Sequence, residues 1–349
     1  MLAPLDWGLG HATRCIPLII HLIEHGCQIT IAAEKATKRL LEKEFPTLEF
    51  IELPGYHISY PKKGRSFIVK ILLQIPKILR AIHQENKWLK HQLKKRSWDI
   101  VISDNRYGLY NEKVTSIFIT HQLRVISGAG KMIDGFIQQF LYKKINLFTQ
   151  CWIPDIEGDE NIAGVLSHPE KKPDKFTYIG LLSRLNKKNE SSNGPILVML
   201  SGPEPQRTIL ENVLIKQTEI LPASFLFVRG LPEASEQLSN RKNIVFKDFM
   251  DLQELSKAMS DAPLVICRAG YSSIMDLLKL NKRAILIPTP GQSEQLYLAN
   301  RMKALKLFAV QYQDEIAIDS EIEHCLKIPE YNNSLNFDGF KKAIKDLGI

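Results

Sequence analysis

The sequence lacks the features that mark several large classes of protein. Its 349 residues hold no Cys-x-x-Cys pair and no other metal-ligand spacing, which excludes zinc modules and disulfide scaffolds. No segment approaches the roughly 18 apolar residues that a membrane-spanning helix needs, and the N-terminus lacks the basic and then apolar pattern of a signal peptide. We therefore expect a reducing, cytoplasmic location for the five cysteines, Cys15, Cys27, Cys151, Cys267 and Cys325.

What the sequence does contain is enough apolar material for a large core. Apolar residues make up 44% and charged residues 24% of the chain, which excludes disorder and predicts one large domain or two smaller ones. No period of roughly 20–50 residues repeats, so a solenoid is excluded as well.

Short apolar and β-branched runs recur with helical patterns between them. Strand, glycine turn, helix and strand follow one another within residues 1–33, which is a βαβ unit with parallel strands. The expected strands are 1–5, 27–33, 48–53, 99–104, 116–120 and 151–155, followed by 195–200, 224–229, 243–249, 263–268 and 283–288. This pattern predicts an α/β protein with two similar halves and a cleft between them, with ligands at the carboxyl ends of the strands.

Domain boundaries are expected where the composition changes. After Asp155 the sequence becomes polar and rich in Lys and Pro, which is typical of a linker. We therefore expect an N-terminal domain over 1–155, a C-terminal domain over 156–336, and an amphipathic helix over 337–349 that docks back on the N-terminal domain. The first strand is short, and we expect that the assigned start removes part of it.

The first glycine turn is a candidate site. Gly8 and Gly10 follow a strand and open a helix, where an anionic or hydroxylated ligand can approach backbone N–H groups. His11 comes next, either as a base or as a helix cap, and a helix N-terminus favours its neutral form. A dinucleotide fingerprint would place a third glycine at Thr13, and Glu34 stands about where a ribose-binding acid belongs, so a dehydrogenase stays open.

Polar residues also follow three other strands. Asp104, Asn105 and Arg106 end the strand 99–104, where they could orient His11, hold a substrate or cap a turn. In the C-terminal half, two neighbouring strands run into helix-opening turns that are rich in hydroxyls, carboxylates and amides, and this pair of turns indicates a nucleotide-sugar site. Its candidate residues are Arg268, Gly270, Ser272, Ser273, Asp276, Glu294 and Gln295.

These motifs carry a resemblance to a known family. The segment VICRAGYSSIMDLL…AILIPTPGQSEQLYLAN resembles the donor-binding region of family 28 glycosyltransferases, and GLGHATR resembles their N-terminal glycine loop. The resemblance implies the GT-B architecture of two Rossmann-like domains. It also implies inverting transfer of a sugar from a UDP-sugar to a hydroxyl acceptor, without a bound metal or other cofactor.

The resemblance also assigns residues. It places Arg184 against the phosphates, Ser201 and Gly202 in the donor loop, Met250 at the base, Asp276 at the ribose in place of a glutamate, and Gln295 at a sugar hydroxyl. Thr120-His121-Gln122 resembles an acceptor-side turn. The predicted catalytic pair is His11 with Asp104, and the predicted acceptor-binding residues are Gly8, Gly10, Asn105, Arg106 and His121.

Charge is concentrated in one stretch. Residues 1–155 carry 22 Lys or Arg against 13 Asp or Glu, whereas 156–349 carry 24 against 25. Residues 62–98 hold eleven of these cations and one acid, Glu85, among apolar residues at helical spacing. The pattern fits either a pair of solvated amphipathic helices around Pro76 or docking on an anionic membrane. Nucleic acid is not expected, because no recognised module accompanies the charge.

The sequence thus predicts a glycosyltransferase, cytoplasmic or peripheral on the inner face of the cell membrane, that uses a nucleotide-sugar donor and a hydroxyl or lipid-linked acceptor. Two alternatives stay open: a UDP-sugar epimerase on the same scaffold, and a non-catalytic nucleotide-sugar-binding protein.

Overall fold

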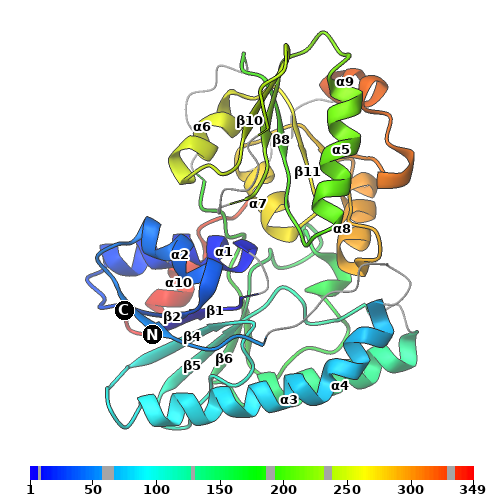
Figure 1. Cartoon of the computed structure of the whole chain (residues 1–349). Helices are drawn as coiled ribbons and strands as arrows, with labels where there is room; N and C mark the ends of the chain where they lie inside the picture. The colour runs from blue at the N-terminus through cyan, green and yellow to red at the C-terminus, as the bar shows by residue number, and fades with distance from the viewer. Residues whose placement is uncertain (7–8, 57–66, 127–129, 186–192, 232–237, 328–334) are drawn as a thin grey trace. The chain divides into compact units, whose positions relative to one another are not determined.

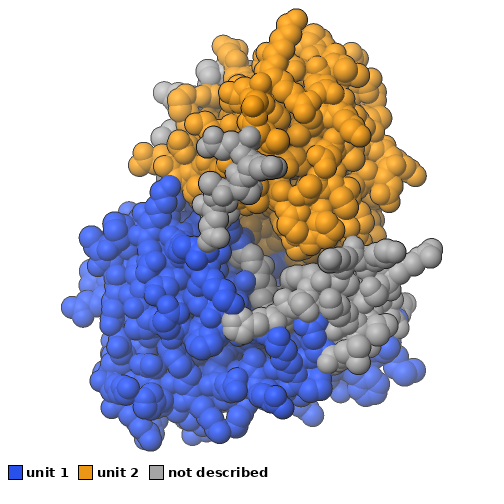
Figure 2. All heavy atoms as spheres, viewed as in Figure 1, with its two compact units in different colours: residues 1–61, 65–184, 335–349 blue, residues 62–64, 185–334 orange. Residues whose placement is uncertain are grey.

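The chain folds into two compact units. The computed structural model describes residues 1–6, 9–56, 67–126, 130–185, 193–231, 238–327 and 335–349. The first unit contains the described residues from Met1 to Arg184 together with Leu335–Ile349, and the second contains the described residues between Leu185 and Ser334. Figure 1 traces the chain, and Figure 2 colours the first unit blue and the second orange.

The first unit is built on a parallel sheet of seven strands in the order β3-β2-β1-β4-β5-β6-β7. The strands lie close to the predicted runs, with one addition, β7. Their bounds are β1 Leu2–Pro4, β2 Thr30–Ala33, β3 Glu49–Glu52, β4 Ile100–Asp104, β5 Thr115–Ile119, β6 Gln150–Ile153 and β7 Phe176–Tyr178. Because all strands are parallel, their carboxyl ends meet at one edge of the sheet.

Helices cover both faces of this sheet (Figure 1). They are α1 Leu9–Glu24, α2 Lys35–Glu44, α3 Phe67–Gln92, α4 Lys131–Ile145 and α10 Gly339–Lys345, with a short 3-10 turn, η2, at Gly164–Leu166. The last of them, α10, packs on this unit: Leu181 N donates to Asn336 O at 2.8 Å, and Phe340 meets His21 edge to face at 5.5 Å. The expected docking of the C-terminal helix is confirmed.

The expected boundary at Asp155 lies inside the first unit. The segment that follows Asp155 returns to the sheet as β7, where Phe176 pairs with Cys151 of β6. The buried Asp155 carboxylate closes the intervening loop by accepting hydrogen bonds from Ile162 N, Ala163 N and the Ser167 hydroxyl at 2.6–2.9 Å. The polar segment is therefore part of the first unit, and the boundary follows Arg184.

The helix α3 is continuous, although a pair of helices was expected around Pro76. Pro76 is exposed, while Ile82, Glu85 and Leu89 are buried. Trp88 packs against the core of the first unit. The apolar spacing in the second half of this helix thus serves packing against the sheet.

The second unit is a parallel sheet of six strands in the order β10-β9-β8-β11-β12-β13. Its strands are β8 Ile196–Met199, β9 Phe225–Val228, β10 Ile244–Lys247, β11 Val265–Cys267, β12 Ala284–Leu286 and β13 Ala309–Val310. Its helices are α5 Gln206–Thr218, α6 Leu252–Asp261, α7 Tyr271–Lys279, α8 Ser293–Ala304 and α9 Ile318–Lys327, with a 3-10 turn, η3, at Gln313–Glu315. The predicted α/β fold with two parallel sheets is confirmed.

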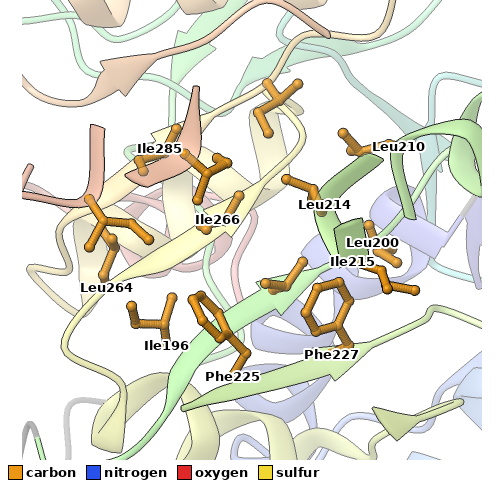
Figure 3. Close-up of a cluster of buried hydrophobic side chains, with 14 of the residues drawn as sticks. Ile196, Leu200, Leu210, Leu214, Ile215, Phe225, Phe227, Leu264, Ile266 and Ile285 are labelled. Atoms are coloured by element: carbon orange, nitrogen blue, oxygen red, sulfur yellow. The ribbon is translucent and has the colours of Figure 1, made fainter. Parts of the chain in front are cut away.

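One apolar cluster holds the second sheet and its helices together (Figure 3). Phe225 and Phe227 of β9, Ile266 of β11 and Leu214 of α5 are at most 1% exposed. Burial of each such side chain contributes about 1.5–3 kcal/mol to stability. This packing fixes the strand ends, and thereby the loops that follow them.

Candidate functional site

His11 and Asp104 meet at the carboxyl edge of the first sheet. His11 lies in the first turn of α1, and Asp104 is the last residue of β4. The distance from His11 Nδ1 to Asp104 Oδ2 is 2.8 Å, with the carboxylate fully buried and the imidazole 17% exposed. A buried carboxylate on Nδ1 is the arrangement that orients an imidazole whose other nitrogen accepts a proton.

Two further residues complete this cluster. Arg14, one turn after His11 on α1, ion-pairs with Asp104 and lies 2.9 Å from His11 Nδ1. Its other terminal nitrogen lies 3.0 Å from Nδ1 of His121, which follows β5. We predicted His121 as an acceptor-side residue and missed Arg14, although its spacing of three residues from His11 places both on one helix face.

The surroundings of the pair lower the pKa of both His11 and Asp104. Burial lowers the pKa of His11 from its ordinary value, and the Arg14 guanidinium lowers it further, against the opposing effect of Asp104. Burial acts to raise the pKa of Asp104, but Arg14 and His11 outweigh it and hold that pKa below its ordinary value. At neutral pH Asp104 is therefore ionised and His11 is neutral.

The neighbouring candidates differ in how the structure places them. Gly8 lies outside the described residues, and Gly10 lies in the first turn of α1. Asn105 has a left-handed backbone with φ of 56°, and its N–H donates to Ile119 O at 3.0 Å. Asn105 is half-buried next to Asp104, so it can still contact a ligand at this edge.

Arg106 is a structural residue, in contrast to the predicted acceptor contact. Its side chain is fully buried, and Nε donates to Glu85 at 2.7 Å. The terminal nitrogens donate to Pro54 O at 2.6 Å and Pro4 O at 3.4 Å. Glu85, the one acid of the basic stretch, is thus the buried partner that attaches α3 to the sheet.

The exchange Arg106→Gln tests the structural role of this side chain. It leaves Glu85 buried without its cation, which we expect to cost about 3–5 kcal/mol of unfolding free energy. Urea denaturation followed by circular dichroism measures the loss. The matched exchange of Arg96, which pairs with Glu49 at the surface, should cost less than about 1 kcal/mol. Equal effects of the two exchanges would show that Arg106 is not a structural anchor.

The donor candidates of the second unit lie at the carboxyl edge of its sheet. Ser201 and Gly202 follow β8, Met250 precedes α6, Gly270 caps α7, and Gln295 lies on α8. Half-buried side chains on α7 and α8 complete the set, namely Ser272, Ser273, Asp276 and Glu294. Arg184, by contrast, is the last residue of the first unit.

Thr289 joins two of these candidates. Gln295 Oε1 accepts a hydrogen bond from Thr289 N at 2.9 Å, and a Cβ on Gly202 would lie 4.0 Å from the Thr289 hydroxyl. That hydroxyl is buried and has no hydrogen-bond partner among the described residues. We did not predict a role for Thr289, and an unsatisfied hydroxyl between Gly202 and Gln295 is a group that a ligand can satisfy.

The buried side chain of Arg268 joins segments that follow several strands of the second sheet. It is 1% exposed, and its guanidinium donates to Gln206 O at 2.8 Å, to Gln313 Oε1 at 2.7 Å, and to Ile287 O and Pro288 O at 3.3–3.4 Å. Burial lowers its pKa to about 10. We predicted a donor contact, but these hydrogen bonds make Arg268 a residue that holds the loops around the site.

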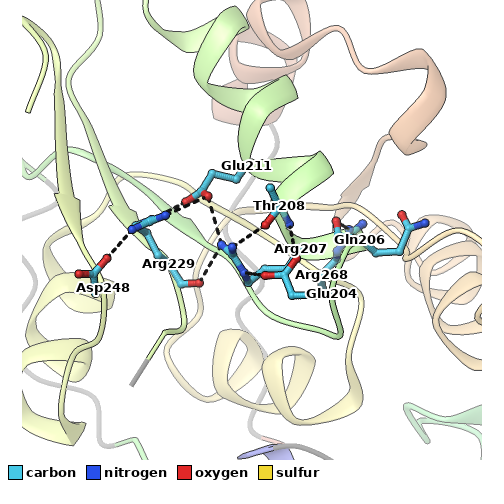
Figure 4. Close-up of polar contacts among 8 residues, drawn as sticks. All are labelled: Glu204, Gln206, Arg207, Thr208, Glu211, Arg229, Asp248 and Arg268. Atoms are coloured by element: carbon cyan, nitrogen blue, oxygen red, sulfur yellow. Dashed lines mark hydrogen bonds and ion pairs between the residues drawn. The ribbon is translucent and has the colours of Figure 1, made fainter. Parts of the chain in front are cut away.

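The N-terminus of α5 is covered by its own chain (Figure 4). Glu204 accepts from Thr208 N at 3.3 Å and from Arg207 Nε at 2.5 Å. Arg207, Arg229, Glu211 and Asp248 extend this into a network of ion pairs. A helix N-terminus that already holds a carboxylate repels a second anion, so Ser201 and Gly202 precede a helix that is a poor phosphate site.

The helix α7 begins after a glycine. Its N-cap, Gly270, makes no side-chain capping bond and has an ordinary φ of −80°. A Cβ built there would meet nothing closer than Ser273 Oγ at 3.9 Å. Since the fold itself does not require glycine, its absent side chain leaves room for a ligand to approach the first turn of the helix.

Comparison with known proteins identifies the functional class of this chain. Residues 209–347 match the glycosyltransferase family 28 C-terminal domain. This match lies mostly in the second unit and extends into α10 of the first. The chain is accordingly a glycosyltransferase, and neither the epimerase nor the non-catalytic alternative finds support in the relatives.

The named relatives extend over most of the chain. UDP-N-acetylglucosamine--N-acetylmuramyl-(pentapeptide) pyrophosphoryl-undecaprenol N-acetylglucosamine transferase of Clostridium perfringens (strain SM101 / Type A) is 25% identical over 88% of this chain and 84% of its own. The enzyme of the same name from Clostridium botulinum (strain Langeland / NCTC 10281 / Type F) is 25% identical over 97% and 93%. A crystal structure of the glycotransferase of kitacinnamycin superposes on this structure with a TM-score of 0.63 and 12% sequence identity. The match covers 93% of the present chain and 89% of the kitacinnamycin glycotransferase. The fold is GT-B.

Proposed function

We propose that this glycosyltransferase moves a sugar from a UDP-sugar to a hydroxyl of a lipid-linked acceptor, with inversion. The second unit binds the donor and the first binds the acceptor. The observation that carries the proposal is the 2.8 Å contact between His11 Nδ1 and the buried Asp104 carboxylate, in a chain whose other unit is a family 28 domain. The named transferases of Clostridium act on a lipid-linked acceptor according to their names, which supports the acceptor class.

The mechanism is a single displacement with a positioned base. His11 Nε2 takes the proton of the acceptor hydroxyl while its oxygen attacks the anomeric carbon, and the bond from that carbon to UDP breaks. The electron pair leaves on the diphosphate, and attack from the opposite side inverts the anomeric centre. Asp104 stabilises the imidazolium that forms.

The leaving diphosphate needs compensation for its charge. In the second unit, we assign this role to the N-terminus of α7 after Gly270, because the helix dipole favours an anion there. The amide oxygen of Gln295 accepts a hydrogen bond from Thr289 N, whereas its amide nitrogen makes none to the described residues. It can donate to a sugar hydroxyl. Asp276, Glu294, Met250, Ser201 and Arg184 are proposed for the remaining donor contacts.

We propose that the reaction uses no metal or other cofactor, since helix N–H groups and side chains supply the charge compensation. Among the described residues, no three His, Cys, Asp or Glu side chains gather as metal ligands would.

A thermal-shift panel tests the donor. A ligand at about 100 times its Kd adds roughly 2.7 kcal/mol, which corresponds to a rise in Tm of roughly 5–10 °C. We expect this rise with UDP and with at least one of UDP-GlcNAc, UDP-glucose and UDP-galactose, with or without EDTA. GDP-mannose and NADH are the matched negatives. A rise with NADH alone, or with none of the nucleotides, would refute the UDP-sugar assignment.

We also propose that the first unit docks on an anionic membrane, where a lipid-linked acceptor resides. On α4, five apolar side chains are exposed on one face or just beyond its end: Met132 at 78%, Phe136 at 70%, and Ile133, Phe140 and Leu147 at 37–47%. The basic stretch supports this surface with exposed Lys77, Arg80, Lys87 and Lys90 on α3. Exposed apolar and aromatic side chains together with exposed Lys and Arg in one unit are typical of a surface that binds an anionic interface.

The side chains of Phe67, Ile68, Leu72 and Leu73, which we also expected at the membrane, lie outside the described set. None of the described helices is long and apolar enough to span a bilayer. We propose a peripheral association on the cytoplasmic face.

Co-sedimentation with vesicles checks the membrane surface. The double exchange Met132→Ser and Phe136→Ser should weaken binding to phosphatidylglycerol vesicles by about tenfold or more, since each side chain contributes about 1.5–3 kcal/mol when buried. Ile220→Ser in the second unit, whose side chain is 80% exposed, should leave binding unchanged. Unchanged binding of the double variant would place the membrane surface elsewhere or nowhere.

A further inference from the structure

Arg14 touches every other member of the His11 cluster. It is 3% exposed, and its guanidinium ion-pairs with Asp104 Oδ1. Nη2 also lies 2.9 Å from His11 Nδ1, and Nη1 lies 3.0 Å from His121 Nδ1. One planar cation thus contacts the Nδ1 atoms of two imidazoles and the Asp104 carboxylate.

The contact with His121 fixes the proton of that imidazole. A guanidinium has five N–H donors and no acceptor, and it does not lose its proton in proteins. The 3.0 Å contact is therefore a hydrogen bond only if His121 Nδ1 carries a lone pair. In its neutral form His121 then carries its proton on Nε2.

The contacts of His11 place its proton on the other ring nitrogen, Nδ1. Its Nδ1 faces both Asp104 Oδ2 at 2.8 Å and Arg14 Nη2 at 2.9 Å, and a single nitrogen can serve only one of them. The ionised carboxylate has no proton to give, so a lone pair on Nδ1 would face a charged oxygen. With the proton on Nδ1, His11 donates to Asp104, and Arg14 Nη2 donates to the second oxygen of the same carboxylate.

We propose that Arg14 is a positioning residue that sets opposite tautomers on the two histidines, with the proton of His11 on Nδ1 and that of His121 on Nε2. His11 then keeps its Nε2 lone pair for a substrate proton. The inference rests on the proposed function for its role in transfer, but the proton positions are properties of the free protein.

Arg14 also sets the pH at which His11 becomes protonated. Among the described residues, charged and titratable groups that act on His11 or its partners include Arg14 and the Cys15 thiol on α1, Asp104 on β4 and His121 after β5. Without Arg14, burial and His121 still lower the pKa of His11, but the cation that opposes Asp104 is gone. A loss of Arg14 therefore raises the pKa of His11 and increases the imidazolium fraction at a given pH.

The pH dependence of kcat separates this role from a purely structural one. In Arg14→Gln, the acidic limb of the profile should move to higher pH by about one unit or more, and activity lost at pH 7 should return in alkaline buffer. Arg14→Lys keeps the charge, so its limb should stay close to that of the unmodified enzyme. Arg96→Gln, which removes a surface cation of the same unit, is the control. A uniform loss at all pH values in Arg14→Gln would contradict the proposal.

Nitrogen-15 NMR of histidine-labelled protein tests the proton positions directly, and it needs neither substrate nor a folded Arg14 variant. The spectra should show His11 as the Nδ1–H tautomer and His121 as the Nε2–H tautomer, with signals assigned by His11→Gln and His121→Gln. The reverse tautomer at His121 would overturn the proposal and leave the transferase assignment intact. Conversely, absence of sugar transfer would refute the proposed function without changing the NMR result.

Discussion

His11→Ala lowers kcat by about 10²–10⁴-fold, because a positioned base contributes that much to proton transfer. The KM for the UDP-sugar stays close to its unmodified value, since the donor is proposed to bind the second unit. The side chain is partly exposed and makes one hydrogen bond to Asp104, so the fold loses only about 1 kcal/mol. Steady-state kinetics with circular dichroism on the same samples measures both quantities.

The matched control is His324→Ala. This histidine is exposed on α9 of the second unit, and its loss should change neither kcat nor stability. A His11→Ala enzyme that keeps more than a tenth of its turnover would show that another group, or water, takes the proton.

Gly270→Ala raises the KM for the UDP-sugar by about 10²-fold with little change in stability. The φ of −80° is open to alanine, and the new Cβ would lie 3.9 Å from Ser273 Oγ, an ordinary contact. The methyl group instead lies at the N-terminus of α7, where the diphosphate is proposed to bind, and a displacement of about 1 Å can cost that factor. Donor titration and thermal melting measure the two effects.

Gly135→Ala supplies the control for this exchange. Gly135 lies on α4, and a Cβ there meets nothing within 4 Å, so KM should stay unchanged, and Tm should not fall because alanine is the better helix former. If Gly270→Ala bound UDP-sugar as tightly as the unmodified enzyme, the diphosphate would not bind at α7.

The sequence was most informative about the strands. Buried parallel strands are continuous β-branched runs, so the segments that became β2, β4, β5 and β8 could be recognised directly. The strands β7 and β13 have three and two residues, too few for a pattern, and they join a sheet because their neighbours offer an edge. This is why the boundary expected at Asp155 was wrong.

Side-chain roles were harder to predict because they depend on partners that are distant in the chain. Asp104 and Arg106 are two residues apart, yet one faces His11 and the other faces Glu85. Two of the three arginines that had been assigned to ligands, Arg106 and Arg268, are buried and bind backbone carbonyls. A signal for Arg14 was present in its spacing from His11, but its partners, Asp104 and His121, are brought to it only by the sheet.

Formation of UDP in the presence and absence of acceptor is the measurement that tests the account most directly. With UDP-GlcNAc, UDP-glucose or UDP-galactose and a polyprenyl-linked acceptor, we predict that UDP and a glycosylated lipid form in equal amounts. Without the acceptor UDP should not form, and with His11→Ala its rate should fall by the factor given above. UDP release at the same rate without acceptor, or epimerised sugar with no UDP released, would contradict the assignment as a glycosyltransferase with His11 as its base.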